Sequence, residues 1–464
     1  MKFLDRTEEL AELRRVLNSV DTPRFGVVFG RRRLGKSTLI KKALSNDDIY
    51  YMAGDFVDTL QLHQLKDQLS VKFPDIALGE YTNYEDLLKM LNILTEEKFT
   101  LCLDEFPYMV KHSPELPSML QRLIDSKELK FNIVICGSSQ RMMQNMILSK
   151  SEPLYGRAYA ILDIRPIPIA YLQEALSLSP VATIEEYSVW GGVPRYWELR
   201  EDRDSLYSAI SATLLSTTGV LYDEPKKIFL DDMTSIVQSE SLMSVVASGA
   251  NRLSEIAARM GREATALSAP IDRLIQINYL RREVPFGDSP KKSKKGIYRI
   301  NDPLMDFYYS FIIPNMSSIG RGRKGFVMEE IQSGFNEYVG RHWEHLCREA
   351  ISGNRVYGHR WTEASRWWGT VMTADGPRSM EFDVVAESSD GSALLVGECK
   401  WTNPEVATEL HRKLLDKTAC FPYAKGKKIV PVLFLKHEPK DIDSSSDLLI
   451  CYPQDVINMA YGEE

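Results

Sequence analysis

The sequence has few cysteines, no long apolar run and no excess of basic charge. Its six cysteines are scattered without a CxxC pair, which gives neither a disulfide framework nor zinc-ligand spacing. No apolar stretch approaches the ~20 residues that span a bilayer, and Met1 to Arg6 has no apolar signal core. With 57 lysines and arginines against 64 acidic residues, the net charge of −7 provides no general attraction to nucleic acid. We therefore expect a cytoplasmic protein with no membrane partner, and only local contacts with nucleic acid.

The length and composition are those of a packed multidomain protein. At roughly 150 residues per domain, 464 residues predict about three domains, each large enough to bury its own core. Apolar residues make up 44% and charged residues 26%, which excludes long disorder and fibrous repeats.

Hydrophobic periodicity changes along the chain and predicts four regions. Residues 1–165 alternate apolar runs with amphipathic stretches, which is typical of an α/β domain with a parallel sheet, and residues 166–248 favour a helical lid. Residues 249–315 predict two short helices and a hairpin, and 314–334 have the Gly and polar content of a linker. Residues 335–464 predict another α/β domain with a first helix, strands near 367–373, 381–387, 393–399 and 428–435, and a helix over 404–418.

A phosphate-binding motif lies early in the first region. Gly30-Arg31-Arg32-Arg33-Leu34-Gly35-Lys36-Ser37 fits GxxxxGK[ST], follows an apolar strand over 25–29 and opens an amphipathic stretch that begins at Thr38. Glycines let backbone N–H groups curl around a phosphate, and a helix N-terminus adds positive potential. Lys36 would reach the β and γ oxygens of ATP, and Ser37 would ligate Mg²⁺.

Two further strand ends in this region carry polar side chains. The strand at 99–103 ends in Asp104 and Glu105, which would hold the Mg²⁺ shell and polarise the attacking water. The strand at 131–136 ends in Gly137-Ser138-Ser139, where Ser138 would sense the γ-phosphate. Solvated acids and plain turn chemistry are the alternative interpretations of these two segments.

These motifs together resemble the archaeal-type ATPases, P-loop proteins of the AAA+-like STAND group. The resemblance rests on Phe3 to Leu10, the loop 30–37, Leu103 to Glu105, Gly137 to Ser139, Gly156-Arg157, Gly191 to Tyr196 and Asn301 to Leu304. The resemblance implies ATP and Mg²⁺ as cofactors, with Asp5 and Arg6 near the base or ribose. It also implies that Arg157 reaches a γ-phosphate, although a surface arginine is an equally open interpretation.

The hairpin region resembles a winged helix-turn-helix. A short amphipathic helix at 253–260 ends at Gly261, and Ser268 would cap a second helix with Pro270 in its first turn. The hairpin tip, Lys291-Lys292-Ser293-Lys294-Lys295, would lie on DNA phosphates. In related ATPases such a module also serves as a lid, and lysine-rich tips are commonly only solvated, so both alternatives stay open.

The last region resembles the PD-(D/E)xK nuclease core, a restriction-endonuclease-like α/β fold. Glu398 and Lys400 lie two apart on an apolar strand and face the same side, 15 residues after Asp383 on another strand. Asp383 and Glu398 would hold Mg²⁺ and Lys400 would orient a water. By resemblance, Glu344 on the preceding helix is the upstream acid, whereas the neighbouring His345 packs or lies at the surface. Solvated charges are the alternative for each, and Phe382 replaces the proline of the named pattern.

The sequence therefore predicts an ATP-hydrolysing protein that couples nucleotide state to DNA binding and Mg²⁺-dependent DNA cleavage. Two other functions remain open: a nucleotide-switched DNA-binding regulator, and a STAND-type signalling scaffold with an inactive nuclease fold. An oligomer is compatible with all three.

Overall fold

The N-terminal lobe is a parallel α/β domain. In this computed structural model, described for residues 3–19, 22–233, 235–373, 376–402, 407–439 and 448–461, the strands lie side by side in the order β2-β3-β4-β1-β5. All neighbouring pairs in this sheet are parallel. The strands are β1 (Phe25–Phe29), β2 (Ile49–Met52), β3 (Thr100–Asp104), β4 (Asn132–Gly137) and β5 (Ala160–Asp163), so the predicted strands are confirmed.

Helices cover both faces of this sheet. Strand residues alternate between faces, so Val28 packs toward α1 and α2 while Val27 and Phe29 pack toward α3 to α7. One face carries α1 (Thr7–Leu17) and α2 (Lys36–Ala43). The other carries α3 (Asp58–Ser70), α4 (Tyr84–Leu94), α5 (Phe106–His112), α6 (Leu116–Ser126) and α7 (Gln140–Leu148). Both faces are therefore buried, as parallel sheets require.

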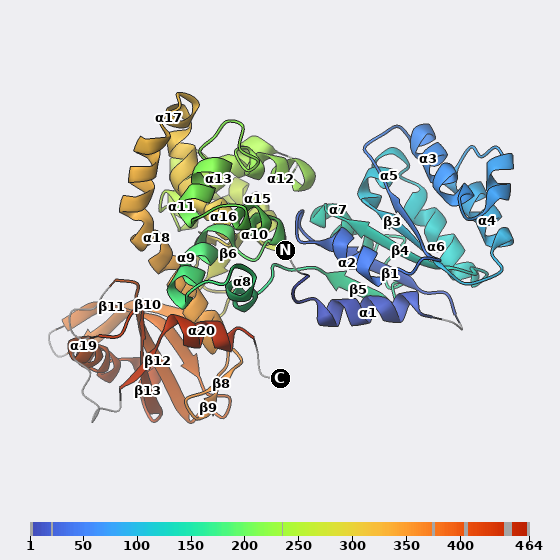
Figure 1. Cartoon of the computed structure of the whole chain (residues 1–464). Coiled ribbons are helices and arrows are strands. Elements are labelled where there is room, and N and C mark those ends of the chain that lie inside the picture. Colours follow the sequence, from blue (N-terminus) through green and yellow to red (C-terminus); the bar gives the residue numbers. More distant parts are fainter. Residues whose placement is uncertain are drawn as a thin grey trace.

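A helical region follows β5 and leads into a short hairpin module. Figure 1 shows this region, in green and yellow, standing apart from the blue lobe. Its helices are α8 (Ile169–Leu176), α9 (Pro180–Trp190), α10 (Pro194–Glu201), α11 (Leu206–Thr213), α12 (Glu224–Asp232) and α13 (Ile236–Ala247). The hairpin module has α14 (Leu253–Met260), α15 (Ala264–Gln276), β6 (Leu280–Glu283) and β7 (Ile297–Ile300). Gly261 ends α14 in the left-handed conformation, as predicted.

The start of α15 corrects the prediction for Pro270. The helix begins at Ala264 rather than at Ser268, so Pro270 lies inside it and not in its first turn. Leu267, Ile271 and Leu274 are buried at helical spacing on both sides of the proline. Their burial offsets the ~3 kcal/mol that an interior proline costs.

The segment expected as a linker is helical. After α16 (Pro303–Phe307) and α17 (Met316–Gly320), a single 28-residue helix, α18 (Lys324–Ile351), runs through the predicted boundary at residue 335. Val327, Ile331, Phe335 and Tyr338 are all buried along it. Burying each of these side chains is worth ~1.5–3 kcal/mol, more than the ~1 kcal/mol that each interior glycine of α18 costs.

The C-terminal domain is built on a second, mixed sheet with the order β10-β11-β12-β13-β14. The β10–β11 and β11–β12 pairs are antiparallel, whereas β12–β13 and β13–β14 are parallel. The elements are β8 (Arg355–Val356), β9 (His359–Arg360), β10 (Ser365–Thr373), β11 (Gly376–Glu387), β12 (Ala393–Lys400), α19 (Ala407–Ala419), β13 (Lys428–Leu435), β14 (Leu449–Cys451) and α20 (Pro453–Met459). The first residues of the helix predicted over 404–418 lie outside the described residues.

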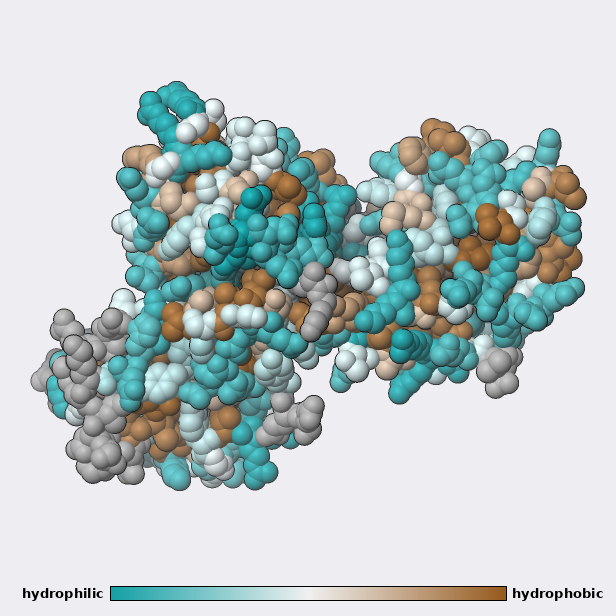
Figure 2. Space-filling model, in the orientation of Figure 1, coloured by the Kyte–Doolittle hydropathy of each residue, from teal (hydrophilic) through white to brown (hydrophobic). Residues whose placement is uncertain are grey.

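One hydrophobic cluster joins the modules. It extends from one face of the N-terminal sheet through the helical region and α18 to one face of the C-terminal sheet. Figure 2 shows two lobes joined by a narrower middle, with mostly hydrophilic surfaces and scattered apolar patches. Within the described residues, no helix combines the length and the apolar character needed to cross a bilayer.

Candidate functional site

The loop between β1 and α2 has the backbone of a phosphate cradle. Gly30 has φ +152, and a Cβ there would lie 2.4 Å from the carbonyl oxygen of Ile164, so only glycine fits. Gly35 caps α2 with φ +85, and nothing lies within 4 Å of where its Cβ would be. Lys36 is the first residue of α2, and its ammonium donates to the carbonyl oxygen of Arg31 over 3.0 Å. The N-terminus of α2 therefore opens onto an unobstructed loop of N–H donors.

The acids predicted from strand β3 lie beside this loop. Ser37 Oγ donates to Asp104 Oδ2 over 2.6 Å, and the Tyr50 hydroxyl donates to the same oxygen. Burial opposes ionisation of Asp104, but hydrogen bonds from Cys136, Ser37 and Tyr50 lower its pKa below the ordinary value. An ionised carboxylate next to a serine hydroxyl is the ligand pair that a nucleotide-bound Mg²⁺ takes.

Glu105 and Ser138 are also in contact. Glu105 follows Asp104 with φ +53, and its Oε2 accepts hydrogen bonds from the Ser138 N–H over 3.1 Å and the Ser138 Oγ over 2.9 Å. The carboxyl ends of β3 and β4 thus bring together two of the predicted side chains, as expected for neighbouring parallel strands.

A cavity of about 600 Å³ lies over the loop. Its polar lining includes Arg6, Lys36, Ser37, Thr38, Glu105 and Ser138 from the predicted set. Residues 32–35 of the predicted loop also line it. The part of the wall that was not predicted as a site consists of Phe3, Leu4, Ile167, Pro194, Arg195, Glu198 and Val220. The turn cluster at residues 191–196 was the available signal for Pro194 and Arg195. With an apolar side for a base and a cationic side for phosphates, the cavity fits a Mg²⁺-nucleotide.

Two residues implied by the family resemblance lie elsewhere. Asp5 is not part of the cavity wall, and burial together with the Asp5 carboxylate raises the pKa of Tyr171. Arg157 precedes β5 and forms an ion pair with Asp125 over 2.8 Å. β5 pairs in parallel with β1, so Arg157, which precedes β5, lies near the N-terminal end of β1. The phosphate cradle follows the C-terminal end of β1, so Arg157 lies at the opposite end of the strands. The structure therefore does not bring Arg157 to the γ-phosphate position of its own chain.

The carboxylates predicted in the C-terminal domain also converge. Val384 pairs with Gly397 across the antiparallel strands β11 and β12. The next residues, Asp383 and Glu398, therefore lie opposite each other. Asp383 Oδ2 accepts the N–H of Cys399 over 2.8 Å. Lys400 Nζ donates to Glu398 Oε1 over 2.8 Å, and Lys417 Nζ from α19 donates to Oε2 over the same distance.

The pKa values of these acids are pushed apart. Burial and the neighbouring Glu398 raise the pKa of Asp383, and burial and Asp383 raise the pKa of Glu344. Burial also works against the charge of Glu398, but Lys400 and Lys417 lower its pKa overall. Among the residues described, no three His, Cys, Asp or Glu side chains form a ready-made metal centre. Mg²⁺ takes only one or two carboxylates plus water and substrate oxygens, so Asp383 and Glu398 fit its donor set.

The comparisons with known proteins identify the domain that carries the first site. A family model of ATPase domains predominantly from archaea matches residues 3–196, and a family of archaeal and bacterial proteins of unknown function matches residues 308–414. The chain is 30% identical over 447 residues to the uncharacterized protein MJECL04 of Methanocaldococcus jannaschii, which covers 92% of this chain and 96% of that protein. The chain belongs to the family of this archaeal protein. Its N-terminal domain is an archaeal-type P-loop ATPase domain.

One solved structure supports the fold over about two thirds of the chain, and a second is similar to a lesser degree. The Walker-type ATPase PABY2304 of Pyrococcus abyssi superposes with a TM-score of 0.51 at 19% identity, over 66% of this chain and 96% of that one. The ORC2 protein of Aeropyrum pernix, solved as ADPNP and ADP complexes, gives a TM-score of 0.42 at 13% identity, over 72% and 96%.

The P-loop of this ATPase domain is tied to the downstream modules. Arg31 forms a buried ion pair with Asp302, which follows β7, and donates to the Tyr196 hydroxyl over 2.9 Å. Arg33 pairs with the buried Glu224 of α12 over 2.9 Å. Neither role was predicted, because nothing in the sequence signals pairing partners so far apart.

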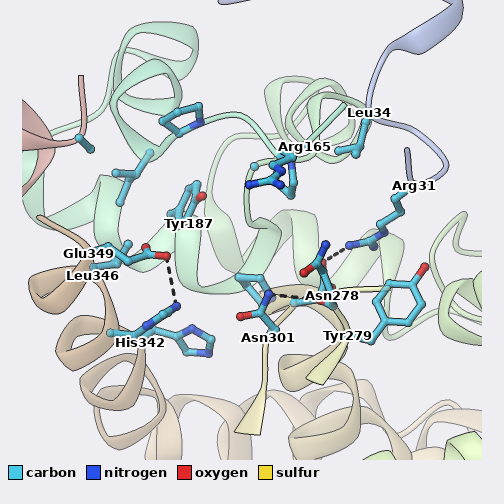
Figure 3. Close-up of a pocket in the computed structure, with 18 of the residues that line it drawn as sticks. Arg31, Leu34, Arg165, Tyr187, Asn278, Tyr279, Asn301, His342, Leu346 and Glu349 are labelled. Atoms are coloured by element: carbon cyan, nitrogen blue, oxygen red, sulfur yellow. Dashed lines mark hydrogen bonds and ion pairs between the residues drawn. The ribbon is translucent and has the colours of Figure 1, made fainter. Parts of the chain in front are cut away.

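A second cavity, of about 580 Å³, lies at this junction. Figure 3 shows Arg31 at one side, Asn278, Tyr279 and Asn301 of the hairpin module below it, and His342 and Glu349 of α18 at the opposite side. The P-loop, the hairpin module and α18 thus line the same cavity, so a movement of one of them changes the shape of the cavity that the other two line.

Proposed function

We propose that this chain is a nucleotide-operated switch whose ATPase domain gates Mg²⁺-dependent cleavage of DNA by the C-terminal domain. The observation that carries the proposal is the juxtaposition of Asp383, Glu398 and Lys400 on the neighbouring strands β11 and β12, directly after the Val384–Gly397 pair. The ATPase domain supplies a cycle of nucleotide binding and hydrolysis that drives the switch.

The topology around the carboxylates supports a nuclease. The order α18, β10, β11, β12, α19, β13, with two antiparallel pairs followed by a parallel one, resembles that of a PD-(D/E)xK core. Asp383 and Glu398 would hold Mg²⁺, with Glu344 as a nearby third acid. The ammonium of Lys400 would orient the attacking water or stabilise charge on the phosphate.

The ion pairs of the P-loop support coupling. Lys36 donates to the carbonyl oxygen of Arg31, and the Arg31 side chain pairs with Asp302. When a triphosphate binds the Lys36 ammonium, Lys36 loses its hydrogen bond to the carbonyl oxygen of Arg31. The loss changes the conformation of the loop that positions the Arg31 side chain. Because Asp302 connects β7 to α16, that disturbance reaches the hairpin module and α18.

The hairpin module supports DNA binding near the carboxylates. Lys291, Lys292, Lys294 and Lys295 are exposed at its tip. At its base, the Phe286 N–H donates to the Arg366 carbonyl over 2.9 Å, and the Phe286 ring packs edge-on against Tyr423 at 5.4 Å. The basic tip is thereby anchored on the domain that carries Asp383. This arrangement favours binding of one DNA strand by both the lysine-rich tip and the site at Asp383.

A second candidate is a DNA-binding regulator without cleavage. The observation that favours it is the engagement of Glu398 by two ammonium groups, those of Lys400 and Lys417, which compete with a metal ion for both carboxylate oxygens. A signalling scaffold with an inactive nuclease fold is the third outcome of the same test.

The test incubates linear and supercoiled DNA with Mg²⁺, with and without ATP. Asp383→Ala removes the candidate metal ligand, and Glu363→Ala, an exposed acid of the same domain, is the matched control. ATP-dependent cleavage by wild type and Glu363→Ala but not by Asp383→Ala supports the proposal. A mobility shift without cutting in all three proteins replaces it with the regulator, and neither activity replaces it with the scaffold.

A further inference from the structure

A small cavity beside the C-terminal carboxylates is lined by arginines from three parts of the chain. Its volume is about 100 Å³, roughly that of three water molecules, so it has room for one compact polyatomic ion. The cationic walls are Arg281, Arg299, Arg341, Arg348 and Arg366, which come from the hairpin strands, α18 and β10. Three carboxylates also face it, those of Glu283, Asp306 and Glu344, and Asp306 is already paired with His342 over 2.9 Å. Guanidinium groups therefore outnumber carboxylates in the lining of the cavity, while Glu337 pairs with Arg341 over 3.5 Å and Glu381 pairs with Arg366 from outside it.

The hairpin itself creates part of this excess. Arg281 and Arg299 are direct partners across β6 and β7. Like charges directly opposite on antiparallel strands are destabilising unless a counter-charge lies between them. Glu283 forms ion pairs with Arg281 over 2.8 Å and with Arg348 over 3.6 Å. Among the described residues, no carboxylate lies within ion-pair distance of Arg299. Arg299 therefore lines the cavity without an ion-pair partner of its own among the described residues, while the charges of Glu283 and Glu344 act on it from a greater distance.

The cavity adjoins the candidate nuclease site. Arg348 donates to the carbonyl oxygen of Asp383 over 2.9 Å, and Glu344 lines the cavity while its charge interacts with that of Asp383. Arg366 pairs with Glu381, two residues before Asp383 on β11. An anion bound by these arginines therefore lies close to Asp383 and Glu398, the carboxylates proposed to hold the metal ion.

We infer that this arginine cavity binds one phosphate group of a DNA strand and so positions the strand at the Asp383 and Glu398 carboxylates. Guanidinium groups are well suited to phosphate because their planar fork donates two parallel hydrogen bonds. The hairpin that carries Arg281 and Arg299 also carries four exposed lysines at its tip, which favours a polymer over a free phosphate ester. The assignment to a DNA strand rests on the proposed function, whereas the anion site stands on the arginines alone.

The first experiment measures the anion site with inorganic phosphate. Because the P-loop is another phosphate site, all proteins carry Lys36→Ala. Calorimetry should detect phosphate binding that Arg299→Gln weakens at least tenfold, while Arg299→Lys retains part of it. Arg360→Gln, which changes an exposed arginine of the C-terminal domain outside the cavity lining, should leave the affinity unchanged. Equal phosphate affinity in the Arg299→Gln protein, checked as folded by circular dichroism, overturns the anion site.

The second experiment measures the strand. Binding of a short DNA duplex is followed in EDTA, so that no cleavage occurs. Arg299→Gln should weaken binding about tenfold and reduce the slope of log affinity against log salt by about 1. If Arg299→Gln loses phosphate binding but keeps its affinity for the duplex, the strand assignment is overturned in favour of a free phosphorylated ligand. Duplex binding that depends on Arg299 without any cleavage in Mg²⁺ upholds the site and overturns only the nuclease.

Discussion

The guanidinium of Arg31 and the carboxylate of Asp302 form a buried ion pair across 271 residues of sequence. One partner belongs to the phosphate loop and the other begins α16, where it also accepts the N–H of Met305 over 2.8 Å. The pair is thus a direct mechanical link between the nucleotide site and the second half of the chain.

Breaking this pair should be costly because it leaves a buried charge alone. Asp302→Ala should lower the free energy of unfolding by about 3–5 kcal/mol. The double variant Arg31→Met, Asp302→Ala removes both charges and should recover much of that loss. Urea denaturation of wild type, both single variants and the double variant measures the coupling, and losses that simply add would contradict it.

Lys36→Ala should abolish ATP turnover, with a loss of at least about 100-fold, because its ammonium stabilises the charge that builds up on the transferred phosphate. The measurement is steady-state release of phosphate from ATP in Mg²⁺. Lys89→Ala, an exposed lysine of α4, is the control and should retain full turnover. Undiminished turnover in Lys36→Ala would remove the proposed nucleotide site.

Gly192→Ala should disrupt the nucleotide cavity. A Cβ at this position would lie 2.1 Å from the carbonyl oxygen of Ile167, whose side chain lines the cavity, so the backbone must shift. We expect weaker binding of a fluorescent ATP analogue and a lower melting temperature. Gly340→Ala is the matched control: its Cβ would meet nothing closer than 3.7 Å within α18, and the helix should gain about 0.5–1 kcal/mol. Equal nucleotide affinity in the two variants would contradict the tight contact.

Stability should fall between pH 7 and pH 5 because of His345. Burial and the nearby Arg281, Arg348 and His342 outweigh Glu283 and keep the pKa of His345 well below its ordinary value. The unfolded chain therefore binds a proton near pH 6.5 that the folded chain does not, which lowers stability by up to about 1.4 kcal/mol per pH unit below that value. His345→Asn should flatten this part of the profile, measured by urea denaturation at several pH values. The same slope in the variant would assign it to other groups.

The local motifs were predictable from sequence. The P-loop depends on glycines at fixed positions between a strand and a helix. The acids of β3 and β12 follow apolar runs, and the period of two along a strand places Glu398 and Lys400 on one face. These features are set by neighbouring residues, so spacing alone indicates them.

What lay beyond sequence reasoning involves distant partners. The helix through the predicted linker formed because Val327, Ile331 and Phe335 pack against modules that are remote in the chain. Arg157 was placed by resemblance, but the parallel pairing of β5 with β1 directs it away from the cradle.

The sequence by itself determined the chemistry of the two sites: a glycine-lined loop with Lys36, and carboxylates on apolar strands, because both are specified over a few neighbouring residues. Only the tertiary structure decided how those sites communicate. Arg31 meets Asp302, and five arginines converge beside Asp383, because burial in one shared core brings together side chains that no local pattern pairs.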